Sequence, residues 1–190
     1  MIAQTAVFFG TTPERLYQAF LSAREHQAMT LDGARPAQFC RPNVGEIERP
    51  AAGDELGAIG LTAPDGGSMF VVQATILELV PSTRIVLGWQ NAGWKLALDP
   101  RKVSSVPSTA ILLFKKNVAG AEIQLVQVGV PDYEVRLPVV LEELSDIPRA
   151  QRAAAEGAPG GEVGPLSTLV NTHWSLVYWE PMKRYFQTPP

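Results

Sequence analysis

The feature that most constrains this fold lies near the C-terminal end of the sequence. From Val170, apolar residues recur with the spacing of an amphipathic helix over four turns, at positions 174, 177, 178, 181, 182 and 185. We therefore expect a helix over 170–186. One of its faces would carry four large side chains: Trp174, Tyr178, Met182 and Tyr185.

A proline interrupts this expected helix. Pro181 has no backbone N–H, and its ring would clash with the carbonyl group of Val177, which costs about 3 kcal/mol in a regular helix. We expect a kink at Pro181 that lets the helix follow a curved surface.

The residues before this helix predict β-strands joined by short turns. The expected strands are 3–9, 38–46, 55–62, 68–79, 84–90, 110–116 and 122–130. Turn signals separate them at 65–67, 81–82 and 117–120. Within the strand 84–90, Ile85, Leu87 and Trp89 would share one face. Because no helices connect these strands, they should pair in antiparallel fashion.

Two short helices are expected after the first strand. Thr12 can cap the first helix, Pro13 suits its first position, and Glu14 favours its positive end. Residues 16, 17, 20 and 21 then form an apolar stripe, and 22–30 predicts a second short helix.

The dimensions of these elements predict how they pack. Six or seven strands make a sheet roughly 30 Å wide. A helix over 170–186 is about 25 Å long and about 10 Å thick, so it cannot cover a flat sheet of that width. The expected fold is therefore an α+β helix-grip, in which a curved antiparallel sheet wraps around the C-terminal helix. The space inside the curve is the natural ligand site.

Composition limits the partners and the compartment. The chain has 190 residues, 16 basic and 19 acidic, with a net charge of −3, which argues against nucleic acid. Cys40 is the single cysteine, which excludes an intramolecular disulfide and favours a reducing compartment, and we expect a small core residue rather than a reactive thiol. No apolar stretch reaches about 18 residues, so no membrane span is expected. The residues 1–5 lack the pattern of a signal peptide, and we expect a cytoplasmic protein.

The order and spacing of several short segments resemble a known family. They are 12–20, 79–81 leading to 84–89, Gly129-Val130-Pro131, His173-Trp174 and 178–186. Together they resemble the family named after the C-terminal domain of the activator of the 90-kDa heat-shock chaperone ATPase, in the START-like, polyketide-cyclase-like SRPBCC superfamily. The resemblance covers nearly the whole chain as a single domain, 1–190, and implies a cavity between the sheet and the last helix. The chain departs from the family in a long segment before that helix, with an elaborated loop at about 138–165.

The sequence contains little that predicts catalysis. The two histidines, His26 and His173, lack zinc-ligand spacing, and no nucleophile elbow or nucleotide-binding glycine pattern occurs, so no catalytic residue, metal or cofactor is predicted. Aromatic residues are the candidates for lining a ligand cavity, although each could equally fill a core. The candidates are Phe39, Phe70, Trp89, Trp94, Phe114, Tyr133, Trp174 and Tyr178.

We rank three functions, with the most expected one first. The first is a binding module for a hydrophobic or amphipathic small molecule, with 138–165 as a lid. The second, implied by the resemblance alone, is a cofactor of a 90-kDa heat-shock chaperone. The third is a cyclase-like or hydrolase-like enzyme, which would require polar groups such as Gln73, Tyr133 or His173 to converge. The sequence leaves the oligomeric state open.

Overall fold

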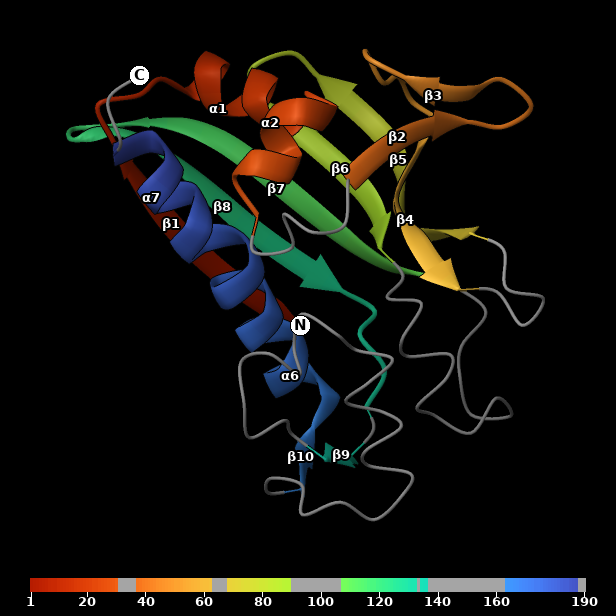
Figure 1. Cartoon of the computed structure of the whole chain (residues 1–190). Coiled ribbons are helices and arrows are strands. Elements are labelled where there is room, and N and C mark those ends of the chain that lie inside the picture. Colours follow the sequence, from red (N-terminus) through yellow and green to blue (C-terminus); the bar gives the residue numbers. More distant parts are fainter. Residues whose placement is uncertain (31–36, 63–67, 90–106, 133, 137–162, 188–190) are drawn as a thin grey trace.

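One antiparallel sheet of eight strands forms the body of the protein. The computed structural model describes residues 1–30, 37–62, 68–89, 107–132, 134–136 and 163–187 (Figure 1). The strand order is β1-β8-β7-β6-β5-β4-β2-β3. The strands are β1 (Ile2–Phe9), β2 (Ala37–Arg41), β3 (Gly45–Ile47), β4 (Glu55–Thr62), β5 (Ser68–Val80), β6 (Arg84–Trp89), β7 (Ser108–Asn117) and β8 (Gly120–Val128). The antiparallel prediction is confirmed, with eight strands rather than six or seven.

Helices and a small second sheet complete the described structure. Helices α1 (Pro13–Phe20) and α2 (Ala23–Ala28) follow β1, as predicted. Thr12 Oγ1 accepts a hydrogen bond of 3.2 Å from the backbone N–H of Arg15, which confirms the predicted cap. Strands β9 (Glu134–Arg136) and β10 (Val163–Pro165) pair with each other in antiparallel fashion.

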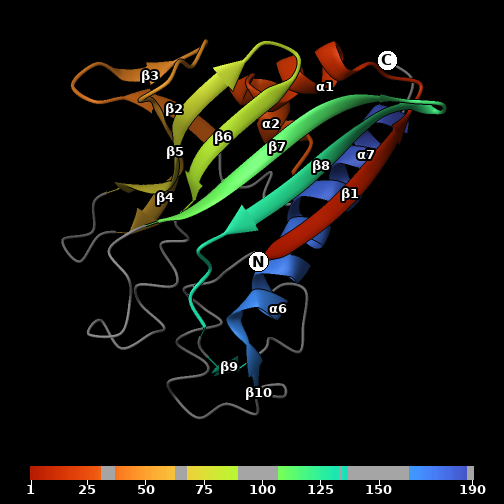
Figure 2. The same cartoon turned by 180° about the vertical axis from the view of Figure 1, so that it is seen from behind.

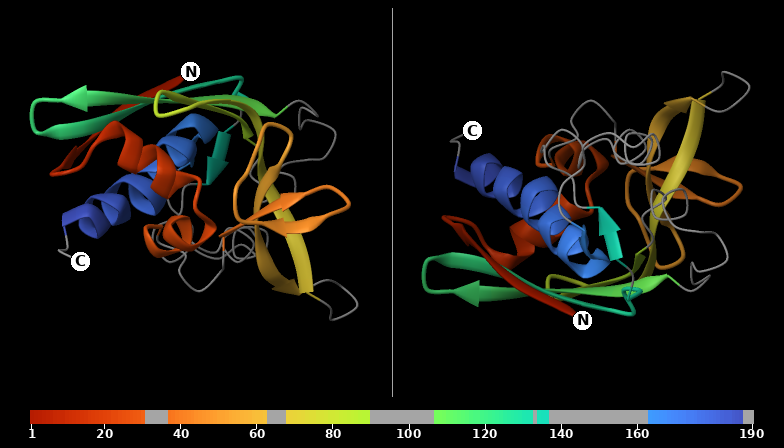
Figure 3. Two further views of the ribbon diagram at one scale, coloured as in Figure 1. Left: turned by 90° about the horizontal axis from the view of Figure 1, so that it is seen from above. Right: turned by 90° about the horizontal axis from the view of Figure 1, so that it is seen from below.

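The C-terminal helix is continuous from Leu166 to Gln187. It consists of α6 (Leu166–His173), a π-helical segment η1 (Trp174–Trp179) and α7 (Glu180–Gln187). It lies along β1 on the inner side of the curved sheet, and α1 and α2 lie on the same side (Figures 1 and 3). This is the helix-grip architecture expected from the sequence.

The expected helix began four residues too late. Leu166 is 1% exposed and lies one turn before Val170, which is 2% exposed, so both belong to the buried face. Pro165 takes an extended conformation, with φ −66° and ψ 142°, immediately before the first turn. A proline cannot donate a hydrogen bond, so it suits the start of a helix, where no donor is needed.

The irregularity expected at Pro181 takes the form of a wide turn. The π-helical segment η1 ends at Trp179, two residues before the proline. In a π-helix the hydrogen bonds join residues five apart, so the backbone is wider there than in an α-helix. The wide turn lies where the missing N–H of Pro181 breaks the regular α-helical pattern.

The prediction of a single strand over 38–46 is wrong, because these residues belong to a hairpin of two strands. Phe39 in β2 pairs with Ile47 in β3, and the turn between the strands places Asn43 at φ 64°. Asparagine tolerates this left-handed conformation better than most residues, and Pro42 before it favours a turn. The turn signals at 42–43 therefore outweigh the strand pattern.

The predicted turn at 81–82 is confirmed, since Thr83 N–H donates a hydrogen bond of 3.0 Å to the carbonyl group of Val80. The predicted turn at 65–67 and most of the loop 138–165, including its expected role as a lid, lie outside the described residues. No helix in the described ranges is long and apolar enough to cross a membrane.

Candidate functional site

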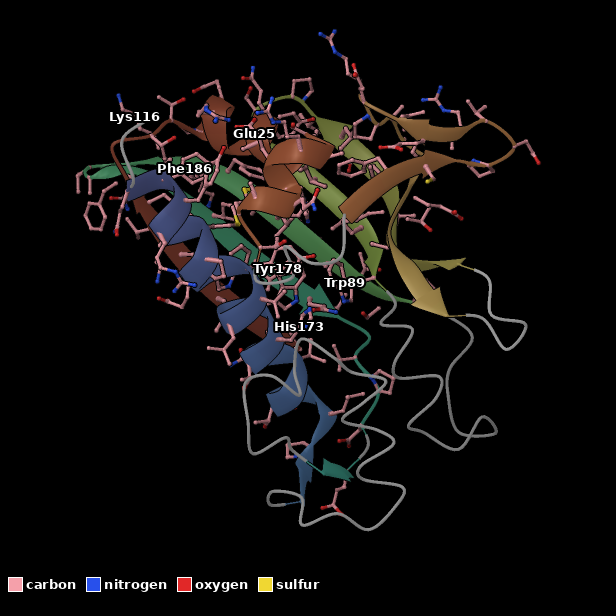
Figure 4. All side chains as sticks on the ribbon, in the orientation of Figure 1. Glu25, Trp89, Lys116, His173, Tyr178 and Phe186 are labelled. Atoms are coloured by element: carbon pink, nitrogen blue, oxygen red, sulfur yellow. The ribbon has the colours of Figure 1, made fainter. Side chains whose placement is uncertain are left out.

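An aromatic cluster lies between the C-terminal helix and the inner face of the sheet. Five of the eight predicted cavity residues belong to it, and each is at most 4% exposed: Phe39, Trp89, Phe114, Trp174 and Tyr178. Their elements are β2, β6, β7 and the π-helical segment, which the curvature of the sheet brings together (Figure 4). Phe70 lies in β5, opposite Ile59, but its side chain is not among those described. Trp94 and Tyr133 lie outside the described residues.

Tyr178 is at the centre of this cluster. Its ring centroid lies 4.7 Å from that of Trp174, 5.9 Å from that of Trp89 and 6.1 Å from that of Phe20, the last in a stacked arrangement. Trp89 and Trp174 also contact each other, with centroids 4.6 Å apart. These centroid separations lie in the favourable range for aromatic pairs, so the helix and β6 are joined by ring contacts as well as by burial of apolar area.

The two histidines of the chain meet at Tyr178. His26 in α2 and His173 at the end of α6 place their ring centroids 5.6 and 6.1 Å from that of Tyr178. His26 Nδ1 donates a hydrogen bond of 2.8 Å to the carbonyl group of Phe20, which assigns the proton of the neutral ring to that nitrogen. The sequence separates the histidines by more than 140 residues, so only the tertiary structure reveals this convergence.

His173 differs from His26 in its hydrogen bonding. The Nδ1 atom of His173 is buried and has no hydrogen-bond partner among the residues that the structure describes. Buried polar atoms without partners are rare in folded proteins, and each requires an explanation such as a bound polar group. His173 also contacts Trp89, at 6.4 Å between ring centroids, so its ring lies beside the aromatic cluster (Figure 4).

The surroundings of the cluster disfavour charge. Burial lowers the pKa of His26 to about 4, against a weaker opposing effect of its bond to Phe20, and burial lowers the pKa of His173 to about 4. Burial also raises the pKa of the Tyr178 hydroxyl well above its usual value. All three groups are therefore neutral at pH 7.

A buried chain of hydrogen bonds runs beside the rings. The indole N–H of Trp174 donates to Gln127 Oε1 at 2.7 Å, and Gln127 Nε2 donates to Ser108 Oγ at 2.7 Å. The Ser108 hydroxyl donates to the carbonyl group of Trp89 at 2.9 Å. Gln127 is fully buried and Ser108 is 2% exposed, so this chain links the helix to β8, β7 and β6 without contact with solvent.

A second group of hydrogen bonds attaches the helix to the edge strand. Gln4 Nε2 in β1 donates to the carbonyl oxygen of Asn171 at 2.8 Å and to its side-chain oxygen at 2.7 Å. The indole N–H of Trp179 donates to Gln4 Oε1. The two glutamines, Gln4 and Gln127, therefore hold the π-helical segment at two points.

Other predicted chemistry is limited. Among the residues described, no three histidine, cysteine, aspartate or glutamate side chains lie close enough together to hold a metal ion. Cys40 is partly buried in β2, and burial, with smaller contributions from Glu46 and Glu55, raises the pKa of its thiol. The expected core residue is therefore wrong, since Cys40 alternates with the buried Phe39 and lies outside the core, but the raised pKa disfavours the reactive thiolate.

Sequence reasoning missed two important members of the site. Gln127 follows Ala121, Ile123 and Leu125 at alternate positions of β8, so strand periodicity places it on the inner face. His26 carries no comparable signal, because its α2 helix is too short for a clear apolar period. Gln73 lies in β5, but its side chain is not among those described.

Comparisons with known proteins complete this description. The sequence matches no protein-family model and no curated protein. Similar solved structures include a protein from Rhodobacter sphaeroides, 14% identical, covering 97% of this chain and 90% of that one at a TM-score of 0.49. Another is a protein from Chromobacterium violaceum, 21% identical, covering 83% and 94% at a TM-score of 0.45. A third is described as an HSP90 activator from Plasmodium falciparum. It is 16% identical and covers 70% of this chain and 74% of that one, at a TM-score of 0.45.

Proposed function

We propose that this protein is a non-enzymatic binding module for a hydrophobic or amphipathic small molecule, held between the sheet and the C-terminal helix. The observation that carries the proposal is the buried Nδ1 of His173, which has no hydrogen-bond partner among the described residues and lies beside the rings of Trp89 and Tyr178. An aromatic wall with one unmatched polar atom is the usual composition of a small-molecule site, where apolar area supplies affinity and a few polar groups fix orientation.

The chemistry of the wall defines the preferred ligand. A charged group would lose its hydration among neutral rings without an opposite charge to compensate, so a neutral ligand is favoured. A hydroxyl both donates and accepts hydrogen bonds, so it satisfies His173 Nδ1 in either tautomer of the ring. The favoured ligand is therefore a neutral aromatic or polycyclic molecule that carries a hydroxyl group. Because Nδ1 is shielded from solvent, the groups that cover it must move when the ligand enters.

The same groups are poorly suited to acid–base catalysis. Proton transfer is most efficient when the pKa of the catalytic group lies near the working pH. With pKa values of about 4, His26 and His173 are weak bases and almost entirely unprotonated at pH 7. Binding is therefore favoured over a cyclase-like or hydrolase-like activity, and the chaperone-cofactor alternative rests on family resemblance alone.

Two matched probes test the proposal. Naphthalene and 2-naphthol differ only by the hydroxyl group, and both quench or shift the fluorescence of tryptophan on contact. We expect both to bind, and 2-naphthol to bind roughly five-fold more tightly because one hydrogen bond contributes about 1 kcal/mol. At 100 times Kd, a bound probe should stabilise the fold by about 2.7 kcal/mol in thermal unfolding.

A His173→Phe variant provides the matched control. It keeps a ring at that position and removes the nitrogen, so naphthalene should still bind and the advantage of 2-naphthol should disappear. If neither probe changes the tryptophan fluorescence or the Tm, the binding-module proposal is wrong. If the His173→Phe variant still binds 2-naphthol more tightly than naphthalene to the same degree, His173 is not the polar contact.

A further inference from the structure

The outer face of the sheet is not covered by any described helix. Figure 2 shows the strands β1, β8, β7, β6 and β5 from this side, with the helices behind them. The strand register aligns one outward residue from each of four neighbouring strands into a row: Ala3, Val126, Ile111 and Val86. Their chain neighbours on the inner face are buried, apart from the half-buried Gln4, whereas these four are exposed or half-buried. An apolar row of this kind crosses the middle of the outer face.

Large exposed apolar side chains lie on the same face. Phe9 is 56% exposed, Leu77 is 51% exposed and Val128 is 40% exposed. Phe9 and Val128 follow the inward residues Phe8 and Gln127 along their strands, so they point outward. Leu77 covers Gly88, with side-chain carbons 3.6 Å from the place where a Cβ atom would stand. Phe9 pairs with Gly120 at one end of β8 and Val128 lies at the other end, so these side chains are distributed along the face. Exposed apolar area on one face is typical of an interaction surface.

Charged side chains lie at the border of this face and form hydrogen bonds within the chain. Glu78 pairs with Val86 and stands at the β5 end of the apolar row, where it accepts a hydrogen bond of 2.6 Å from Arg84. Toward the β7–β8 turn, Lys115 donates to Gln124 Oε1 at 2.6 Å, and Gln124 donates to Glu122 at 2.7 Å. A centre without charge inside a polar rim is the composition of protein–protein interfaces.

We propose that the outer face of the sheet binds a second copy of this chain, face to face, to form a two-fold symmetric dimer. The charged side chains of this face that the structure describes already hydrogen-bond within the chain, and the one group named without a partner, Nε of Arg84, is buried, so a partner of opposite charge would gain little here. A second copy would place its own apolar residues against those of the first copy. It would introduce no repulsion between like charges at the centre of the interface. Two-fold contacts of this self-matching kind are the commonest in soluble oligomers.

The area of the face is sufficient for such a dimer. Five strands about 4.8 Å apart, with four outward rows about 6.7 Å apart, cover roughly 650 Å² per copy, or roughly 1,300 Å² in total. Specific interfaces bury about 1,200–2,000 Å² in total. The proposed dimer lies at the lower end of that range, so its dissociation constant should be measurable by dilution.

Sedimentation velocity across a dilution series of the full chain tests the dimer. The chain has a mass of 20.6 kDa, so the expected species are the monomer and a dimer of twice that mass. Ile111→Lys places a charge at the centre of the face and should abolish the dimer. Val44→Lys is the matched control, because Val44 is 67% exposed in the β2–β3 turn, away from this face, and should leave the dimer unchanged.

A second variant controls for misfolding of the first. Leu77 is half exposed, so Leu77→Lys should fold normally, as judged by circular dichroism, and should weaken the dimer at least ten-fold. If the protein stays monomeric at every concentration up to about 1 mM, the proposal is overturned. A dissociation constant of about 1 mM corresponds to an association free energy of about −4 kcal/mol. A dimer that survives both Ile111→Lys and Leu77→Lys would equally overturn it, because the contact would then lie elsewhere.

Discussion

Trp174 in the C-terminal helix donates its indole N–H to Gln127 Oε1 in β8 over 2.7 Å, and both side chains are fully buried. This hydrogen bond crosses the interface between helix and sheet, the interface that defines the fold. Gln127 uses its amide N–H to reach Ser108, so it acts as an acceptor toward the helix and as a donor toward β7. The helix is therefore held in register by a specific polar contact as well as by its apolar face.

Removal of this contact should destabilise the protein. Gln127→Leu leaves the Trp174 indole N–H buried without a partner, which costs about 1–3 kcal/mol. We expect a fall of that size in the free energy of unfolding, measured with urea. Trp174→Phe combined with Gln127→Leu should be less destabilising than the sum of the single variants.

Gln124→Leu is the control for this prediction. Gln124 lies on the outer face of the same strand and bonds only to partly exposed groups, so its replacement should change stability by less than about 0.5 kcal/mol. Equal losses in the two leucine variants would contradict the role assigned to Gln127.

Stability should fall as the pH falls from about 6.5 toward 4. The folded-state pKa values of His26 and His173, about 4, lie below the usual value of 6.5, so the unfolded chain binds more protons in this window. The stabilisation is fully present above pH 6.5 and is lost as the pH approaches the folded-state values. For His26, which is 1% exposed, the loss is on the order of 3 kcal/mol.

Urea unfolding at several pH values measures this dependence. His26→Gln retains a donor for the carbonyl group of Phe20 but cannot titrate, so the slope of stability against pH should decrease in this variant. A wild-type stability that stays constant between pH 4.5 and 6.5 would show that the histidines are not buried in solution as they are in the structure.

Gly120 should tolerate no side chain. It lies at φ +146°, and a Cβ atom added there would stand 2.5 Å from the carbonyl oxygen of Phe8. Gly10 has φ +66°, but no atom lies within 4 Å of its added Cβ. Gly10→Ala should therefore cost only the backbone strain, about 1–2 kcal/mol, whereas Gly120→Ala should cost more because β1 must also move. Thermal unfolding of the two variants compares them directly, and equal Tm losses would contradict the predicted contact.

The thiol of Cys40 should react slowly. Burial first, and then the nearby carboxylates of Glu46 and Glu55, raise its pKa and reduce the thiolate fraction at neutral pH. Alkylation by iodoacetamide at pH 7.5 should be slower than that of free cysteine. The rate should increase in denaturing urea, and rapid alkylation of the folded protein would contradict the raised pKa of this partly buried thiol.

Several features of the fold could be predicted because they depend on local periodicity. Ile85, Leu87 and Trp89 alternate along one strand, and all three are at most 2% exposed on the inner face. Thr12 and Pro13 define the start of α1 by local hydrogen bonding and a fixed backbone angle. The hairpin at 42–44 was not predicted, because the strand-like residues on both sides gave more weight to a single strand than Pro42 and Asn43 gave to a turn.

The candidate site was predicted only in part, because its polar members come from distant segments. The aromatic candidates Phe39, Trp89, Phe114, Trp174 and Tyr178 were identifiable as large apolar residues on predicted inner faces. Their contacts with His26 and His173 depend on how α2 and the C-terminal helix enter the curve of the sheet. No local pattern encodes that arrangement.

The sequence by itself determined the elements, since amphipathic periods, caps and turn residues act over a few neighbouring positions. Only the tertiary structure decided which polar atoms meet. The bond from Trp174 to Gln127, the neutral histidines around Tyr178 and the uncovered outer face all depend on the bend of the sheet, which results from packing between residues far apart in the chain. Burial then sets the hydrogen bonds and pKa values of these groups, because the energy of a polar group depends on what surrounds it.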